Sequence, residues 1–158
     1  MERTLVLIKP DALQRDLVGE IITRLERKGL KLIGIKMIAL TEDLLDTHYI
    51  HLRERDFFPE VKAFMRSTPI IASCWEGTDC VNTVRKLCGV TMARQAEPGT
   101  IRGDLAMSVQ ANLVHASDTG DTAITEVGRF FATHELFDYT DQLEYFIYST
   151  RETGEEGK

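Results

Sequence analysis

The chain has no long hydrophobic run and few cysteines. No apolar stretch approaches the roughly 20 residues that span a bilayer, and the apolar run from Leu5 to Ile8 is too short for a signal peptide before the charged Lys9. The three cysteines form no Cys-x-x-Cys pair, so we expect small buried or half-buried thiols in a reducing compartment. These absences predict a soluble, cytoplasmic protein with no membrane partner.

Common phosphate-binding loops and an excess of positive charge are also missing. There is no G-x-x-x-x-G-K-(S/T) motif and no G-x-G-x-x-G motif after the first apolar segment, so scattered side chains must hold any bound phosphate. The net charge of −6 disfavours nucleic acid as a partner. Because salt screens charges over about 10 Å, a local basic cluster can still hold a small polyphosphate.

What the sequence does contain is the pattern of one globular domain. Hydrophobic residues make up 43% of its 158 residues and charged residues 28%. Apolar periodicity predicts strands at 3–9, 30–40, 69–75 and 113–114, and helices at 18–25, 42–52, 58–67, 81–88 and around 124–131. Thr41 and Asp121 are the expected N-caps of the second and last helices. Residues 90–111 have no clean period and predict a long irregular loop, a kind of segment that is usually functional.

This order of elements contains β-α-β-β-α-β, the ferredoxin-like arrangement. We therefore predict an α+β fold with a four-stranded antiparallel sheet, added helices and the long irregular loop. A single domain is expected to cover residues 1–149. The acidic residues 150–158 are expected to form a disordered tail.

The four histidines differ in their surroundings. His48 and His51 lie three positions apart in a predicted helix, so they could share a face and bind a metal ion, but no third ligand is evident and a solvated pair is expected. His134 lies near a helix end, where a cap or surface role is expected. His115 ends an apolar strand before a polar loop that enters a helix, where amide donors and the helix dipole favour anions. These residues alone leave open whether His115 is catalytic or structural.

Candidate phosphate ligands are dispersed along the chain. Lys9 ends a strand, Arg85 lies on a helix, and Thr91 and Arg102 lie in the irregular segment. Taken singly, each is typical of a solvated surface group. Spacing alone does not join them into a site.

One segment carries a specific resemblance. Residues 112–118 read N-L-V-H-A-S-D, which closely resembles the active-site signature N-x-x-H-(G/A)-S-D of nucleoside diphosphate kinases. Four other segments resemble the family in the same order: T-L-V-L-I-K-P-D from Thr4, H-Y-I-H-L-R-E-R-D-F-F from His48, W-E-G from Trp75 and P-G-T-I-R-G-D from Pro98. The similarity covers about residues 3–148, nearly the whole chain.

The resemblance implies a phosphotransferase that moves the γ-phosphoryl group from a nucleoside triphosphate, typically ATP, to a nucleoside diphosphate by a ping-pong mechanism. His115 would be the nucleophile, oriented by Glu126, Ser117 and Tyr49. Nucleotide binding would fall to Lys9, Phe57, Arg85, Thr91, Arg102, Val109 and Asn112. Since every base has a π-face that can stack on Phe57, with Val109 on the other side, we expect purine and pyrimidine nucleotides, in ribo and deoxyribo forms, to be accepted.

The implied cofactor is Mg²⁺ that arrives with the nucleotide, without a dedicated protein site. Asp118 could contact it through water, or could be a solvated carboxylate or helix cap. The family forms hexamers or tetramers from a common dimer, and we expect a homo-oligomer, with a hexamer favoured. Thr91-Met92-Ala93 stands where many members have Thr-Asn-Pro, and loss of the proline removes a rigid loop element that bears on this assembly.

Two other functions use the same features. A histidine phosphocarrier or protein phosphotransferase would use His115 but pass the phosphoryl group to a partner protein. A non-enzymatic nucleotide-binding regulator would be indicated by loss of the histidine, the lysine or an arginine, yet all of them are present.

Overall fold

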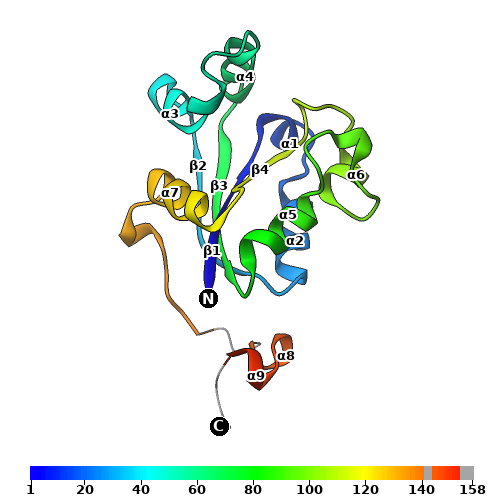
Figure 1. The fold of residues 1–158 in the computed structure, drawn as a ribbon, viewed down its shortest axis with the longest axis vertical. Helices are drawn as coiled ribbons and strands as arrows, with labels where there is room; N and C mark the ends of the chain where they lie inside the picture. Colours follow the sequence, from blue (N-terminus) through cyan, green and yellow to red (C-terminus); the bar gives the residue numbers. More distant parts are fainter. Residues whose placement is uncertain (141–143, 154–158) are drawn as a thin grey trace.

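A computed structural model describes residues 1–140 and 144–153 (Figure 1). Its four strands are β1 (Glu2–Ile8), β2 (Lys31–Ile38), β3 (Ile70–Gly77) and β4 (Val114–Ala116). They form one sheet in the order β2-β3-β1-β4, and every neighbouring pair is antiparallel. The predicted ferredoxin-like fold is confirmed by this order.

Helices cover both faces of the sheet (Figure 1). On one face lie α2 (Val18–Arg27) and α5 (Cys80–Cys88), and on the other lie α3 (Glu42–His48), α4 (Phe58–Met65) and α7 (Gly120–Phe130). The central strand β1 is apolar on both sides because it contributes to both cores. Val6 and Ile8 pack with α2 and α5, whereas Leu5 and Leu7 pack with the opposite helices, and all four are 0% exposed.

Short elements complete the chain: α1 (Pro10–Gln14), η1 (Ile50–Leu52), η2 (Ala93–Gln95), α6 (Ile101–Leu105), η3 (Thr133–Glu135), α8 (Glu144–Ile147) and α9 (Thr150–Thr153). Two of them, η2 and α6, lie in the segment that we predicted to be irregular. The predicted helix over 42–52 is divided into α3 and η1. Helices of three to five residues show too little of a 3.6-residue period to be recognised from sequence.

Of the two predicted N-caps, one is confirmed and the other is wrong. Thr41 caps α3 as predicted, with its Oγ1 accepting from the Leu44 amide at 3.2 Å. Asp121 is not the cap of α7, because Thr119 takes that place and accepts from the Thr122 amide at 3.2 Å. Thr119 is the residue with extended backbone immediately before the helix, whereas Asp121 already lies in the first turn.

The edge strand β2 exposes part of its apolar side. A register shift between Leu32 and Gly34 interrupts the pairing with β3. After this irregularity, Ile35 and Met37 are 47% and 63% exposed. Ile33 is buried although it alternates with these two residues in the sequence. The bulge breaks the simple alternation of a strand and turns Ile35 and Met37 to the other side.

The cysteines match the prediction, whereas the first C-terminal residues of the expected tail are helical. All three cysteines are free and buried, as predicted. Residues 150–153, where the disordered tail was expected to begin, form α9, and the Glu152 carboxylate accepts from the Ser149 amide at 3.0 Å. Residues 154–158 of the expected tail lie outside the described residues. None of the described helices is both long and apolar enough to cross a membrane.

Candidate active site

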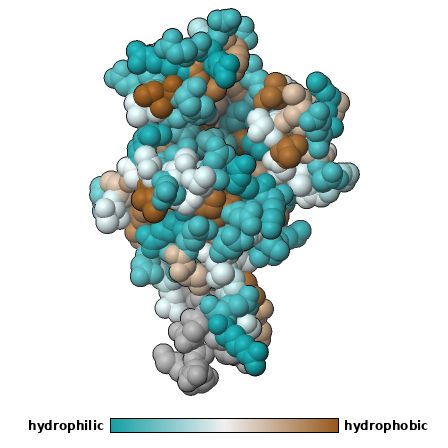
Figure 2. Space-filling view, in the orientation of Figure 1, coloured by the Kyte–Doolittle hydropathy of each residue, from teal (hydrophilic) through white to brown (hydrophobic). Residues whose placement is uncertain are grey.

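A cleft of about 1100 Å³ lies between the α3–α4 part of the molecule and the segment around α6. The space-filling view is indented between these two parts, at the top and right of Figure 2. Among the predicted site residues, those that line the cleft are Lys9, Tyr49, Phe57, Arg85, Thr91, Arg102, Val109, Asn112, His115, Asp118 and Glu126. Ser117 is buried and contacts Glu126.

His115 lies in the middle of β4, directly opposite Leu7 of β1. Its Nε2 is 3.0 Å and 3.2 Å from the two carboxylate oxygens of Glu126. An ionised carboxylate only accepts hydrogen bonds, so the proton of a neutral His115 ring is on Nε2. This pairing leaves the lone pair on Nδ1, which is the arrangement that a nucleophilic imidazole needs.

Glu126 reaches His115 from α7 and is itself held from the other side. The Ser117 hydroxyl donates to Glu126 Oε2 at 2.6 Å. Burial alone would raise the pKa of Glu126, but the hydrogen bonds from His115 and Ser117 lower it to about 2. The carboxylate is therefore ionised at neutral pH and fixes the ring orientation of His115.

His48 is a member of the site that we did not predict. The expectation of a solvated pair with His51 is wrong for His48, whose side chain is 1% exposed at the end of α3. Arg129 Nη1 donates to His48 Nδ1 at 3.1 Å. His48 Nδ1 is also 3.7 Å from Glu126 Oε1. Burial lowers the pKa of His48 to about 3, so the ring is neutral near pH 7. No spacing in the sequence links His48 to Arg129.

Aromatic contacts surround the two histidines. The His48 and His115 rings meet edge to face, with centroids 4.6 Å apart. Tyr49 is buried, and its ring centroid lies 4.6 Å from that of His48 and 6.1 Å from that of His115. Burial and the charge of Glu126 raise the pKa of Tyr49, so its hydroxyl stays protonated.

A strained residue turns the chain into β4 just before His115. Leu113 is fully buried and has a φ of +73°, which is unusual for a residue other than glycine. Asp11 Oδ2 accepts from its amide at 3.0 Å, and its carbonyl accepts from the Lys9 amide at 2.8 Å. Such conformations persist only where the surroundings fix them, and they are frequent at active sites. Nothing in the sequence pattern marked Leu113.

Lys9 and Asn112 form the buried floor of the cleft. Lys9 Nζ donates to Asn112 Oδ1 at 2.7 Å and to the Gln110 carbonyl at 2.5 Å. Asn112 Nδ2 in turn donates to the carbonyls of Thr91 and Val109 at 3.0 Å and 2.9 Å. Burial lowers the pKa of Lys9 to about 8, with Arg102 also lowering it and Asp11 opposing the shift.

Arg102 is held in a cradle of backbone carbonyls. Its Nη1, Nη2 and Nε donate to Gly89, Val114 and Asn112 at 2.7, 2.6 and 3.3 Å. These bonds use three of the five guanidinium N–H groups, which leaves two for an anion. Glycine allows the close approach of the chain here, since a Cβ on Gly103 would be 2.0 Å from the Glu97 carbonyl oxygen. Burial lowers the pKa of Arg102.

The outer part of the cleft is more exposed. Arg85 on α5 forms an ion pair with Asp118, and their side chains are 47% and 74% exposed. Phe57 and Val109 are 49% and 51% exposed. The outer part of the cleft thus combines an exposed ion pair with two partly exposed apolar side chains.

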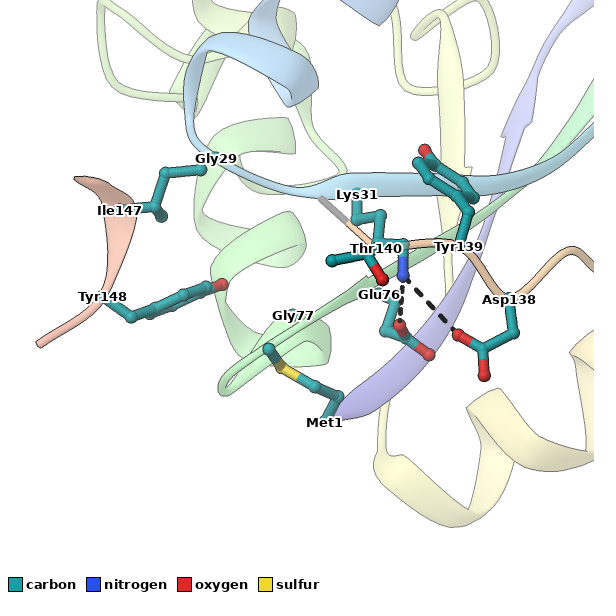
Figure 3. Close-up of a pocket in the computed structure, with 10 residues that line it drawn as sticks. All are labelled: Met1, Gly29, Lys31, Glu76, Gly77, Asp138, Tyr139, Thr140, Ile147 and Tyr148. Atoms are coloured by element: carbon teal, nitrogen blue, oxygen red, sulfur yellow. Dashed lines mark hydrogen bonds and ion pairs between the residues drawn. The ribbon is translucent and has the colours of Figure 1, made fainter. Parts of the chain in front are cut away.

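A second pocket, of about 420 Å³, lies away from this site, near the start of β1 and β2. It is lined by Met1, Gly29, Lys31, Glu76, Gly77, Asp138, Tyr139, Thr140, Ile147 and Tyr148, and by none of the predicted site residues (Figure 3). Lys31 Nζ is 3.5 Å from Glu76 Oε1 and 3.8 Å from Asp138 Oδ1. Its charge is thus already paired within the protein.

Comparisons with known proteins identify the family of the chain. The sequence matches the nucleoside diphosphate kinase family over residues 2–136. A nucleoside diphosphate kinase from Parabacteroides distasonis is 55% identical over 139 residues, which cover 88% of this chain and 91% of the relative. Human nucleoside diphosphate kinase A is 46% identical over 147 residues, which cover 93% of this chain and 97% of the relative.

Solved structures show the same fold. A nucleoside diphosphate kinase from Halobacterium salinarum, in complex with CDP, superposes with a TM-score of 0.92 at 42% identity, covering 94% of this chain and 99% of that one. A Babesia bovis family protein superposes with a TM-score of 0.90 at 36% identity, covering 94% and 100% of the two chains. The chain belongs to the nucleoside diphosphate kinase family.

Proposed function

We propose that this nucleoside diphosphate kinase works through a covalent phosphohistidine at Nδ1 of His115. The single observation that carries the proposal is the pairing of Nε2 with Glu126, which leaves Nδ1 with the lone pair. In the first half-reaction, Nδ1 forms a bond to the γ-phosphorus while the bond to the β–γ bridging oxygen breaks, and that oxygen leaves with the electron pair. In the second, a β-phosphate oxygen of the acceptor diphosphate displaces His115 in the same way.

The proton on Nε2 stays with the ring throughout this cycle. The positive charge that develops on the imidazole as the N–P bond forms is stabilised by the ionised Glu126, which Ser117 holds in place. Tyr49 and His48 restrict the ring through their edge contacts. We assign these residues orienting roles, since none of them needs to exchange a proton with the substrate.

The basic residues are proposed to bind the phosphate chain. Charge spreads over the equatorial oxygens of a transferring phosphoryl group, so fixed cations lower the barrier. Arg102 has two N–H groups left for this task, and Arg85 can exchange Asp118 for a phosphate oxygen. Lys9 and Asn112 at the floor, and the hydroxyl of Thr91, supply the remaining donors.

The base is proposed to bind between Phe57 and Val109 at the entrance. Stacking on an aromatic ring requires no particular hydrogen-bonding edge, so purine and pyrimidine nucleotides should both bind. The Halobacterium salinarum relative was solved with CDP, a pyrimidine diphosphate, which supports this proposal. Competition kinetics with GDP, CDP, UDP and deoxy-GDP test it, and a strong preference for one base would contradict it.

Mg²⁺ is proposed to enter as part of the substrate, bound mainly by phosphate oxygens. Asp118 is the carboxylate at the exposed side of the cleft that fits a water-mediated contact with the ion. Its present partner, Arg85, would then be released to the phosphates. No all-protein cage is required for this role.

Assembly and location are further parts of the proposal. We propose a homo-oligomer, with a hexamer favoured over a tetramer, and the exposed apolar Ile35 and Met37 on edge strand β2 support association of copies. Sedimentation analysis distinguishes the two sizes.

We also propose a cytoplasmic location, where the three free cysteines stay reduced. A relative from Arabidopsis thaliana is named as chloroplastic/mitochondrial. Imaging of a fluorescent fusion tests the location.

A two-stage label transfer tests the mechanism. The protein is mixed with γ-labelled ATP and Mg²⁺, free nucleotide is removed, and GDP is added, with His115→Ala run alongside. An acid-labile, base-stable label that moves promptly to GTP supports the proposal. Label that stays on the protein until another protein is added would favour a phosphocarrier, and absence of label from protein that binds nucleotide would favour a regulator.

A further inference from the structure

Three side chains of the kinds that bind transition metals converge in the cleft from three different elements. His48 ends α3, His115 lies on β4 and Glu126 lies on α7. One ligand atom from each residue can be chosen so that all three lie within 4.8 Å of one another. His51, the histidine that sequence spacing paired with His48, is exposed and does not belong to this cluster.

Two of the three spacings between ligand atoms are close to those around a zinc-sized ion. Tetrahedral zinc with bonds of about 2.0–2.1 Å separates its ligand atoms by about 3.3 Å. The distance from Glu126 Oε1 to His115 Nε2 is 3.2 Å, and that from Glu126 Oε1 to His48 Nδ1 is 3.7 Å. Two imidazoles and one carboxylate are a known ligand set for zinc sites that keep a fourth position open. Mg²⁺ prefers six oxygen ligands and does not suit this set.

The surroundings prepare two of the ligands. Ser117 donates to Oε2 of Glu126, which orients the carboxylate and leaves Oε1 for the ion. His48 is packed against Tyr49 and Phe130 with ring centroids 4.6 Å and 5.1 Å away, so its ring is already ordered.

One contact opposes the ion. Arg129 donates to His48 Nδ1 at 3.1 Å, so it must leave that atom before a metal can bind there. Arg129 is half-buried on α7, and its charge repels a cation. Removal of this side chain should therefore strengthen binding, whereas removal of His48 should weaken it.

We propose that His48, His115 and Glu126 form an inhibitory site for a transition-metal ion of the zinc type. Metal bonding to Nε2 of His115 displaces the proton from that nitrogen, and the ring retains a proton by taking it up on Nδ1. The ring stays neutral, and no net proton is released. The lone pair that would attack the γ-phosphorus is then absent. Inhibition rests on the proposed phosphohistidine mechanism, but metal binding does not.

Cobalt is the probe for binding, because four-coordinate Co²⁺ absorbs visible light and Zn²⁺ does not. Metal-free, assembled protein is titrated with Co²⁺ in a metal buffer that contains excess Mg²⁺. We expect one four-coordinate Co²⁺ per protomer, displaced by Zn²⁺. His48→Gln should weaken binding at least about tenfold, Arg129→Ala should strengthen it, and His134→Gln, at an exposed position, should leave it unchanged.

Equal Co²⁺ affinity in wild type and His48→Gln would overturn the site, as would weaker binding to Arg129→Ala. Circular dichroism and sedimentation establish that each variant is folded and assembled. If His48→Gln does not fold, X-ray absorption of the zinc-loaded wild type decides, because the proposal requires two imidazole ligands. A spectrum with one imidazole or none would refute it.

The inhibitory part has its own readout. Label transfer from γ-labelled ATP to the protein is measured at saturating nucleotide while free Zn²⁺ is fixed by a buffer. We expect phosphohistidine formation to fall in parallel with occupancy of the site, with ATP binding retained. Metal that binds through His48 but leaves the phosphorylation rate unchanged would refute the inhibition. Failure of the kinase mechanism itself would instead abolish labelling in the absence of zinc.

Discussion

The buried His48 should make the protein sensitive to mild acid. Its pKa is lowered from 6.5 to about 3 by burial. Below pH 6.5, His48 therefore binds a proton in the unfolded chain but not in the native protein, so the free energy of unfolding falls as the pH decreases. At pH 5.5 the unfolded side chain is about nine-tenths protonated, and the native protein should be about 1.4 kcal/mol less stable than at pH 7.5 through this residue alone.

The pH interval isolates His48 from its neighbour Glu126. The pKa of Glu126 is lowered from 4.5 to about 2, so its stabilising effect is fully present above pH 4.5 and is lost only as the pH falls toward 2. Between pH 7.5 and 5.5 the carboxylate contributes less than about 0.1 kcal/mol to the change. A difference measured in this interval therefore reports on the imidazole.

Urea unfolding of wild type and His48→Gln at the two pH values tests this reasoning. Glutamine is neutral and close in size, so the variant should lose about 1.4 kcal/mol less than wild type between pH 7.5 and 5.5. Trp75, the single tryptophan, is 0% exposed and reports the transition by fluorescence. Chelator is included, and the protomer concentration is held constant because association shifts apparent stability.

The exposed His134 supplies the matched control, since His134→Gln should follow the wild-type pH dependence. An equal loss of stability in wild type and His48→Gln would refute the argument. It would mean that the native protein accommodates a charged His48, for example by moving Arg129 away from Nδ1.

Three further predictions concern single contacts of the site. Lys9 has a pKa of about 8, so its positive charge is lost above that pH and kcat/KM should fall as the pH rises through 8. Lys9→Gln should lower kcat/KM at pH 7 and remove that fall from the pH–rate profile. Gly103→Ala should lower the free energy of unfolding in urea by about 1–3 kcal/mol, because the new Cβ would be 2.0 Å from the Glu97 carbonyl oxygen. The control Gly19→Ala, whose Cβ would have nothing within 4 Å, should not destabilise the protein. Ser117→Ala removes the 2.6 Å hydrogen bond to Glu126 and should slow phosphohistidine formation about 10- to 100-fold in rapid-quench assays. An unchanged rate would exclude an orienting role for Ser117.

Elements with a strong apolar period were predictable from the sequence. β1 is a run of apolar residues between two cores, and α2 and α5 each bury one stripe, so their local patterns agree with the fold. Two of the elements that were missed, η2 and α6, are short and contact each other, and α6 also contacts α5. Thr100 caps α6 by accepting from the Gly103 amide at 3.0 Å. This cap is local, like that of Thr41, but a helix of five residues shows too little apolar period to be recognised from the sequence.

Only the resemblance predicted that the distant residues of the site would share one cleft. Lys9 and Asn112 are 103 positions apart and hydrogen-bonded in the cleft, and spacing gave no reason to join them. His48 was misassigned for the same physical reason, because its partner Arg129 is 81 positions away. Positive φ at Leu113 depends on Asp11, another distant residue. Residue types that bind phosphate are common on surfaces, and only the tertiary structure distinguishes a ligand from a solvated group.

The two arginines of the cleft differ in how their charges are compensated, and in the proposed mechanism this difference gives them different roles. Arg102 donates to three backbone carbonyls and is buried, so its position is set by the fold before any ligand arrives. Arg85 is paired with a carboxylate, Asp118, and both groups are exposed. A fixed cation stabilises developing charge without reorganisation, whereas an exchangeable pair can admit and release the substrate. A ping-pong site must bind a triphosphate, release a diphosphate and then bind another diphosphate, so it needs both kinds of contact. A cleft of fixed cations alone would hold the first diphosphate too tightly for the second half-reaction to begin.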